Sequence, residues 1–143
     1  MREAPTAVDT ALRALRHRDL SAQELEQRLR AKGFEESERA GALETLERTG
    51  LLDDARFAEA RARSLAARGA GDAAIRHALS VAGVATQFVD EALAGLGPEI
   101  ERAGAIVARR GGGPKTARYL RGKGFSDDVV AAVVAASNAE ELG

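Results

Sequence analysis

The hexapeptide Leu29-Arg30-Ala31-Lys32-Gly33-Phe34 recurs in related form at Leu79-Ser80-Val81-Ala82-Gly83-Val84 and at Leu120-Arg121-Gly122-Lys123-Gly124-Phe125. Each copy has the pattern of a last helical turn that ends at a glycine. Glycine just past a helix adopts left-handed dihedral angles without a Cβ penalty, and the apolar residue after it can fold back on the helix. The chain therefore predicts three helix ends of the same kind.

A second helical pattern follows each of these glycines. Apolar residues recur there at intervals that place them on one helix face. They are Phe88, Val89, Ala92, Leu93 and Leu96 in the second copy, and Val129, Val130, Val133 and Val134 in the third. The first copy has Ala42, Leu43 and Leu46, but Glu38 and Arg39 stand where apolar residues are expected. Repeats of about forty residues predict small helical units that stack to bury their apolar faces.

The composition of the 143-residue chain favours a helical protein with an aliphatic core. Hydrophobic residues make up 45% and charged residues 30%, whereas only 3% are aromatic. The absence of cysteine excludes disulfides and thiolate chemistry. No apolar segment approaches the roughly 20 residues of a membrane span, and Met1 to Asp9 contain no apolar signal core. We therefore expect a cytoplasmic protein.

These patterns predict an all-α protein of three tandem three-helix repeats, at residues 7–50, 51–96 and 97–139. Ser21 and Glu24 have the spacing of a capping box, and Ser126 is the expected cap of the last helix. Residues 138–143 are expected to fray. The predicted helices span residues 7–16, 21–32, 36–49, 54–68, 73–82, 86–96, 98–110, 115–123 and 127–137.

Charge is distributed unevenly, although the formal net charge is only −1. Residues 35–54 contain seven acidic and two basic side chains, whereas residues 102–123 contain seven basic side chains and no acidic one. A nearly neutral total can therefore include a basic surface that attracts phosphates or acidic protein surfaces.

The strongest local pattern is a basic stripe in the third repeat. Lys115, Arg118 and Arg121 recur at every third residue of one expected helix, which Lys123 follows. Tyr119 lies among these bases, where it could stack on a nucleobase or simply pack. The stripe predicts a groove for phosphates or acidic surfaces, and the alternative is an ordinary solvated face.

Four further arginines extend this candidate groove. Arg109 and Arg110 lie just across the glycine turn from the stripe and can join it. Arg61 and Arg68 are seven residues apart, so they share a face of the long helix in the second repeat. Together with Lys115, Arg118, Arg121 and Lys123, they form the set of candidate binding residues.

Motifs for catalysis are weak. The adjacent Asp53 and Asp54 are better explained as a helix cap than as an acid–base pair. His17 and His77 lie far apart with no cysteine to complete a zinc site. The glycines before Pro114 resemble a phosphate loop only superficially, because the spacing is wrong and Pro114 removes an amide donor. We favour a simple turn for these glycines. Binding of an anion at the start of the helix that follows remains an alternative. We expect no enzyme, metal site or cofactor.

The chain resembles the RecX regulators of the RecA recombinase. The resemblance rests on Ser21-x-x-Glu24-Leu25-x-x-x-Leu29-x-x-x-Gly33-Phe34 and on Gly50-Leu51-Leu52-Asp53-Asp54-x-x-Phe57-Ala58, together with the weaker second and third copies. It extends from about Ala7 to Ala136. It implies three tandem three-helix repeats in an elongated, curved array.

The resemblance also implies a non-enzymatic function. Such proteins bind the RecA–DNA filament in its helical groove, block filament growth and favour disassembly, which restrains recombination and the SOS response. The expected partner is therefore the RecA filament, with weak direct contact to single-stranded DNA and a monomeric chain. Two alternatives remain open: a protein that binds DNA directly without RecA, since capped three-helix units resemble helix-turn-helix geometry, and a helical scaffold for another protein.

Overall fold

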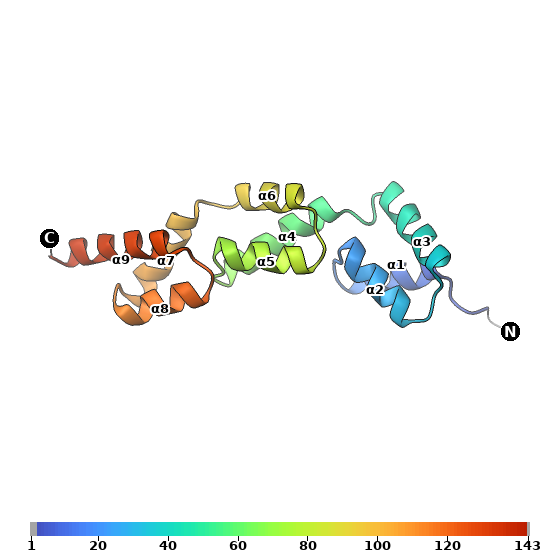
Figure 1. Cartoon of the computed structure of the whole chain (residues 1–143), viewed down its shortest axis with the longest axis horizontal. Helices are drawn as coiled ribbons and strands as arrows, with labels where there is room; N and C mark the ends of the chain where they lie inside the picture. Colours follow the sequence, from blue (N-terminus) through green and yellow to red (C-terminus); the bar gives the residue numbers. More distant parts are fainter. Residues whose placement is uncertain (1–2, 143) are drawn as a thin grey trace.

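The computed structural model describes residues 3–142 and contains, within that range, nine α-helices and no β-strand (Figure 1). Met1, Arg2 and Gly143 lie outside the described residues, so part of the stretch searched for a signal peptide does too. The helices are α1 (Ala7–His17), α2 (Ala22–Ala31), α3 (Glu36–Arg48), α4 (Asp54–Ala67), α5 (Asp72–Val81), α6 (Thr86–Ala94), α7 (Glu99–Arg110), α8 (Pro114–Gly122) and α9 (Asp127–Leu142).

The helices form three groups of three, which we call unit 1 (α1–α3), unit 2 (α4–α6) and unit 3 (α7–α9). Each unit encloses its own aliphatic core, and extensive helix packing occurs within units. The units follow one another in an elongated array (Figure 1). The predicted all-α tandem architecture is therefore confirmed, while the exact limits of the units stay predictions.

Each repeat glycine ends its helix as predicted. Gly33, Gly83 and Gly124 have φ of 91°, 82° and 94°, in the left-handed region. The next amide then donates back to a carbonyl of the last helical turn. These bonds run from Phe34 to Leu29 (3.2 Å), from Val84 to Leu79 (3.1 Å) and from Phe125 to Leu120 (3.1 Å). This Schellman arrangement turns the chain back toward the core and buries Val84 and Phe125.

The predicted apolar faces form the cores. Leu29, Leu79 and Leu120 are fully buried, one in each unit. The helices that follow the glycines contribute Ala42, Leu46, Val89, Ala92, Val130 and Val133 to the buried residues.

The two polar residues in the first copy have a structural explanation. Arg39 reaches across to α2, where its Nε lies 2.7 Å from the Glu26 carboxylate, and its Nη1 donates to the Phe34 carbonyl at 2.6 Å. Glu38 accepts the Glu35 amide and so completes a capping box for α3. At Arg39 and Glu38, hydrogen bonds to α2 and to the residues just before α3 thus replace apolar packing.

Unit 1 joins unit 2 through the start of α2. The buried Ser21 hydroxyl donates to the Ala82 carbonyl at 2.6 Å, and Gln23 donates to the Val81 carbonyl at 2.9 Å. The Asp54 carboxylate accepts the Ala22 amide at 2.8 Å. The start of α2 therefore meets the end of α5. Asp54 bonds across units, while Asp53 caps α4 as expected.

Unit 2 joins unit 3 at the corresponding place, where backbone groups of the two units bond directly to each other. The Gly71 amide donates to the Lys123 carbonyl at 2.8 Å, and the Ala73 amide donates to the Gly124 carbonyl at 3.2 Å. A Cβ atom on Gly71 would collide with the backbone of Gly124 and Phe125. Glycine is required here because the two backbones touch.

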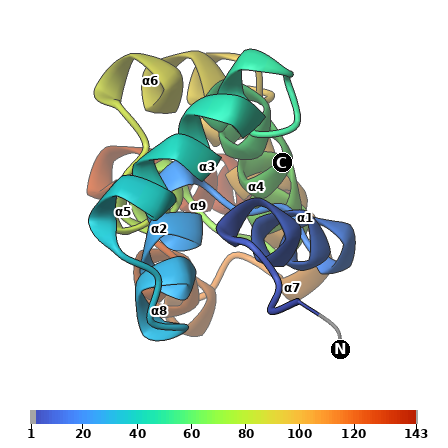
Figure 2. The ribbon, with the colours of Figure 1, turned by 90° about the vertical axis from the view of Figure 1, so that its right-hand side faces the viewer.

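The helices α2, α5 and α8 consequently lie end to end along the array. Carbonyls at the end of one helix, which are unpaired within it, accept from the start of the next: from amides at α5, and from the Ser21 and Gln23 side chains at α2. The helix dipoles then point the same way along this column. Viewed end-on, the units lie one behind another (Figure 2).

The expectation that residues 138–143 fray is wrong for residues 138–142, because α9 continues to Leu142. This last segment contains alanine, glutamate and leucine, which are strong helix formers, and neither glycine nor proline interrupts it. The Ser126 hydroxyl accepts the Val129 amide at 3.2 Å, as expected for a cap. Within residues 3–142, no helix combines the length and hydropathy that a membrane span requires.

We expect Leu29→Ala to lower the free energy of unfolding by about 2–5 kcal/mol, because it removes a fully buried side chain and leaves a cavity in unit 1. Urea unfolding followed by circular dichroism measures the change. Val81→Ala, at a position that is 64% exposed, is the control and should cost little. Equal effects of the two substitutions would contradict the assigned core.

We expect Gly71→Ala to lower the free energy of unfolding by about 1–3 kcal/mol, because the added methyl group collides with the backbone of Gly124 and pushes unit 2 away from unit 3. Hydrogen exchange should then show faster exchange of the Gly124-bonded Ala73 amide. Gly122→Ala adds the same methyl group within α8, where it meets no neighbour within 4 Å, and should not destabilise the protein. A tolerated Gly71→Ala would rule out the close backbone contact.

Candidate binding site between the units

A basic groove lies where the end of α4 meets α7 and α8, and we call it the α4–α7 groove. Its volume is about 350 Å³, and its lining consists of Ala67, Arg68, Gly69, Ile106, Arg109, Arg110 and Tyr119. Gly69 follows the α4 C-cap residue Arg68 and has φ of 90°, so it turns the chain away from α4. A Cβ there would stand 3.7 Å from the Tyr119 hydroxyl and 3.6 Å from Lys123 Cε, so Lys123 borders the groove.

A cation–π contact orders one wall of this groove. The guanidinium carbon of Arg110 lies 3.6 Å from the centre of the Tyr119 ring. Within residues 3–142, no carboxylate lies within ion-pair distance of Arg68, Arg109 or Arg110. The groove therefore presents three uncompensated guanidinium groups, one of them held in place by an aromatic ring.

A second groove, the α1–α4 groove, lies at the corresponding place between units 1 and 2. It has a volume of about 190 Å³ and is lined by Arg18, Asp19, Phe57, Ala60, Arg61 and Ser64. Arg18 is the C-cap residue of α1, as Arg68 is of α4. The guanidinium of Arg61 lies over the Phe57 ring, 5.0 Å from its centre. Each groove thus combines a C-cap arginine with an arginine held over an aromatic ring.

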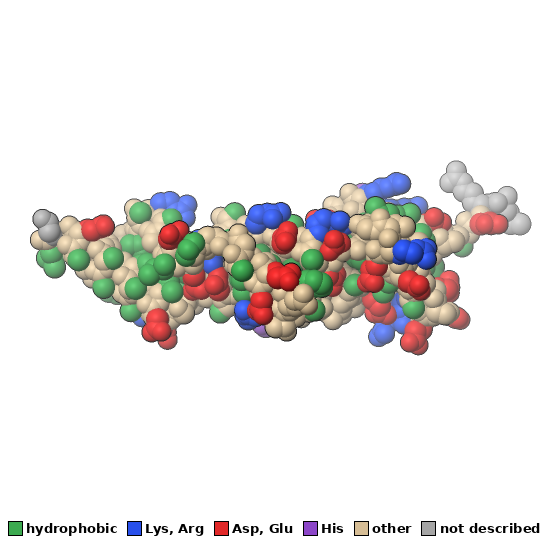
Figure 3. Space-filling model, turned by 90° about the horizontal axis from the view of Figure 1, so that it is seen from above, with side chains coloured by type: hydrophobic (Ala, Val, Ile, Leu, Met, Phe, Trp, Pro, Cys, Tyr) green, Lys and Arg blue, Asp and Glu red, His purple; other side chains and the backbone are tan. Residues whose placement is uncertain are grey.

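The structure divides the predicted binding residues into separate sets. Arg68, Arg109 and Arg110 come together in the α4–α7 groove, with Lys123 at its border, whereas Arg61 lies in the α1–α4 groove. In Figure 3, Lys and Arg side chains recur along one long edge of the array over all three units.

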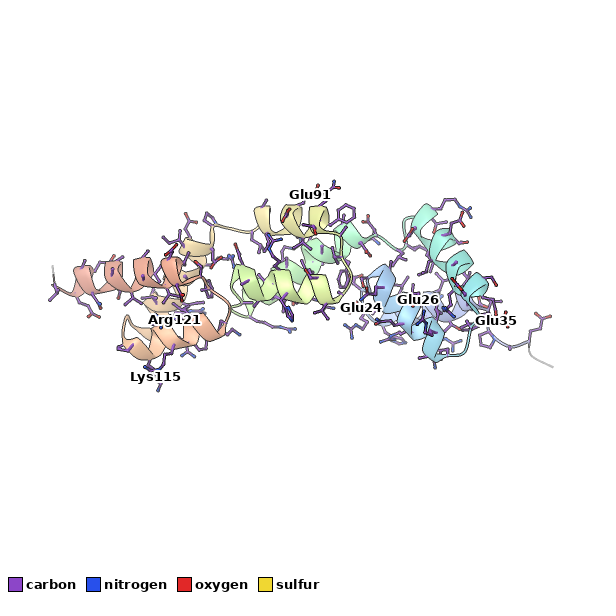
Figure 4. All side chains as sticks on the ribbon, viewed as in Figure 1. Glu24, Glu26, Glu35, Glu91, Lys115 and Arg121 are labelled. Atoms are coloured by element: carbon purple, nitrogen blue, oxygen red, sulfur yellow. The ribbon has the colours of Figure 1, made fainter. Side chains whose placement is uncertain are left out.

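The predicted stripe on α8 does not face one way. Lys115, Arg118 and Arg121 are all exposed, but Arg121 turns toward α9, where its Nε lies 3.3 Å from the Asp127 carboxylate. Figure 4 shows Lys115 on the outer side of α8 and Arg121 on the side of α9. Neither Lys115 nor Arg118 lines the α4–α7 groove, to which α8 contributes Tyr119 and no basic side chain.

An acidic pair and one arginine hold unit 3 against unit 2 beside this groove. Arg102 on α7 bonds to the Asp72 carboxylate, and its Nη1 donates to the Ala70 carbonyl at 3.1 Å. Glu99 accepts the Ser126 amide at 3.0 Å and faces Asp72. Burial raises the pKa of the Glu99 carboxyl above its ordinary value of 4.5; the Ser126 amide opposes this, and nearby Asp72 adds to it.

This arrangement suits the binding of a polyanion rather than a covalent reaction. Guanidinium groups bind phosphate or carboxylate oxygens through paired hydrogen bonds, and an aromatic ring accepts a stacked base. Ser64 lines the α1–α4 groove without a histidine beside it. His17 lies in unit 1 and His77 in unit 2, on different helices.

The sequence interpretation missed Arg18, Gly69 and Arg102. Arg18 and Arg68 are separated by the same fifty residues as Leu29 and Leu79, so an alignment of the repeats could have found Arg18. Arg102 follows Arg61 by the same 41 residues that separate Leu79 and Leu120, so the same alignment could have found it. Gly69 had no such signal, because its role depends on contacts between units.

Models of one protein family match two parts of the chain. The first three-helix domain of RecX matches residues 7–46, and the second three-helix domain of RecX matches residues 53–93. These matches cover nearly all of the helices of units 1 and 2.

Relatives and solved structures agree with that match. The chain is 37% identical to "Regulatory protein RecX" of Chromohalobacter salexigens, over 87% of this chain and 88% of the relative. It is 34% identical to the protein of that name from Halorhodospira halophila, over 93% and 89%. The crystal structure of RecX from Lactobacillus salivarius superimposes with a TM-score of 0.79 over 92% of this chain and 94% of that one, at 21% identity, which shows a common fold.

We expect the stabilising contribution of Glu99 to be greatest below pH 4.5 and to be lost as the pH rises through its raised pKa, because folding disfavours the ionised form. Glu99→Gln keeps an acceptor for the Ser126 amide but cannot ionise. The unfolding free energy of the parent protein relative to this variant should therefore fall over the pH range above 4.5. Urea unfolding across this range measures the difference, with the exposed Glu101→Gln as control. A difference that does not vary with pH would contradict the assignment.

Proposed function

Because this chain belongs to the RecX family, we propose that it is a regulatory protein that binds the RecA–DNA filament. It binds in the filament groove, blocks extension of the filament and promotes its disassembly. Recombination and the SOS response are thereby restrained. The action is non-enzymatic, takes place in the cytoplasm, and requires a single copy of the chain at each binding position.

The two basic grooves support this proposal. A filament on DNA is a helical polymer with regularly repeated surfaces, and a tandem array can follow it with one contact at each junction. Arg61 and Arg68, one in each groove, are separated by seven residues of α4, or about 10 Å along the helix axis. The contacts therefore recur on a rigid element rather than on a loop.

The α4–α7 groove is the observation that carries the proposal. It combines Arg68, Arg109 and Arg110 with Tyr119, and these cations have no acidic partner within unit 2 or unit 3 as far as residue 142. We propose it as the principal contact with the filament. Lys123 at its border, Arg61 in the α1–α4 groove, and the exposed Lys115, Arg118 and Arg121 are proposed as further contacts.

Direct binding to DNA is the alternative that the Arg110–Tyr119 pair favours, because cations beside an aromatic ring are typical of single-strand binding sites. Fluorescence anisotropy with a labelled oligo-dT distinguishes the two. For a filament regulator, the affinity for bare DNA should be low and fall steeply with salt. An affinity for oligo-dT equal to that for RecA filaments would favour the alternative.

The test of the proposal is the ATPase activity of RecA on single-stranded DNA. We expect strong inhibition at fewer than one chain per RecA protomer, because blocking growth or promoting disassembly affects many protomers. If saturating protein did not inhibit the ATPase, the proposal would be overturned, and the chain would share only the fold of RecX proteins.

We expect Arg68→Glu/Arg110→Glu to raise the concentration needed for half-inhibition about tenfold or more, since like charges then face the polyanion. The matched control is Arg16→Glu/Arg48→Glu, two exposed arginines outside both grooves. Circular dichroism verifies that all variants are folded. Equal inhibition by the groove variant and its control would exclude the α4–α7 groove from the mechanism.

A further inference from the structure

The turn between α7 and α8 makes a close contact that the two basic grooves do not explain. It contains three glycines, of which Gly112 is buried while Gly111 and Gly113 are exposed. A Cβ atom on Gly112 would lie 2.7 Å from the Cβ atom of Ser137 on α9, which is closer than two carbon atoms can approach without a shift. The backbone of the turn therefore lies directly against the Ser137 side chain.

A comparison of the three units shows that the turn of unit 3 is unusual. The residue just before the N-cap of the second helix is Leu20 in unit 1 and Ala70 in unit 2, and each is buried in the core of its unit. The corresponding residue of unit 3 is Gly112, which precedes the α8 N-cap residue Gly113. Gly112 therefore lacks the side chain that anchors the other two turns to their cores.

The position that faces this turn also has a smaller side chain in unit 3. Counted from the glycine that ends the second helix, the same place holds Leu46 in unit 1, Leu96 in unit 2 and Ser137 in unit 3. Leu46 belongs to the same core as Leu20, and Leu96 packs against the core that contains Ala70. Because both positions are small in unit 3, the turn and α9 can approach each other closely.

Ser137 extends the core-facing side of α9 by one helical turn. It follows Val133 by four residues and Val134 by three, so the three side chains lie on the same side of the helix. Val133 is buried in the core of unit 3, and Val134 packs against that core. The core thus fixes the position of α9, and Ser137 is a firm support for the turn.

The turn connects the two helices that form the cation–π contact of the α4–α7 groove. Arg110 is the last residue of α7 and precedes Gly112 by two residues, whereas Tyr119 lies on α8. The guanidinium carbon of Arg110 lies 3.6 Å from the centre of the Tyr119 ring. A shift of the turn would therefore change the distance between the guanidinium group and the ring.

We propose that the packing of Ser137 on Gly112 holds Arg110 over Tyr119, so that both are positioning residues for polyanion binding in the α4–α7 groove. Neither residue lines the groove, and both act through Arg110. A guanidinium group that is already held in place loses less conformational entropy when it binds a phosphate or carboxylate. The effect on RecA rests on the proposed function, whereas the contact between Arg110 and Tyr119 can be measured on the protein alone.

The spectroscopic signals of tyrosine test this inference on the full chain. Tyr119 is the only tyrosine, and the chain has no tryptophan, so tyrosine fluorescence and the tyrosine band in near-ultraviolet circular dichroism report on this ring alone. Gly112→Ala should change both signals, because the added methyl group collides with Ser137 and shifts the turn. The matched control Gly113→Ala adds a methyl group that meets no neighbour within 4 Å, and it should leave both signals unchanged.

A second substitution distinguishes positioning from a general loss of packing. Ser137→Gly removes the support and should also change the tyrosine signals. Gly112→Ala/Ser137→Gly places the methyl group in the space that the serine side chain leaves, and it should restore the signals of the parent protein. Because this double variant has the same glycine in α9 as the single variant, its recovery would exclude a weakened helix as the cause.

The RecA ATPase assay then measures the consequence for binding. Each single variant should raise the concentration needed for half-inhibition about two- to fivefold, the worth of one exposed cation–π contact, and the double variant should restore it. Tyrosine signals that do not respond to Gly112→Ala would overturn the inference, as would altered signals with unchanged inhibition. If the parent protein did not inhibit RecA, the proposed function would fail, but the tyrosine signals would still decide whether Ser137 positions Arg110.

Discussion

The hydrogen bonds between the end of one helix and the start of another hold the array together. They satisfy backbone groups that a helix cannot pair by itself, and they fix the spacing of neighbouring units. The two junctions achieve this differently. At the first, the Ser21 hydroxyl reaches the Ala82 carbonyl; at the second, the Gly71 amide reaches the Lys123 carbonyl directly. The second junction is more demanding, because two backbones must touch.

The basic grooves follow from these junctions. End-to-end contact along α2, α5 and α8 leaves open spaces where the first helix of one unit ends beside the first helix of the next. Arginines occupy those helix ends, as Arg18 and Arg68 illustrate. A cation at a helix C-terminus is stabilised by the dipole, so the same side chain can support its own helix and face a partner. The binding surface therefore arises from the geometry of the fold.

Local patterns were sufficient to predict the helices, because glycine conformation and apolar spacing act within a few residues. The cores around Leu29, Leu79 and Leu120 were predictable for the same reason. Arg39 was not, since its partner Glu26 lies on another helix. The groove was only partly predictable: its arginines were identified, but Arg121 was assigned to the same surface although Asp127 draws it away. Contacts between residues as distant as Ser21 and Ala82 leave no trace in local spacing.

The order of the helices along the column has a consequence for synthesis. The ribosome releases unit 1 first, yet the acceptor for the Ser21 hydroxyl is the carbonyl of Ala82, which emerges 61 residues later. Likewise, the Gly71 amide can bond to the Lys123 carbonyl only after residue 123 has emerged. Each unit can collapse around its own core as it emerges, because domains fold as units during synthesis. Each newly completed unit then supplies the carbonyl acceptors that the preceding unit lacks. The junctions between units therefore form in order, from the N-terminal one to the C-terminal one.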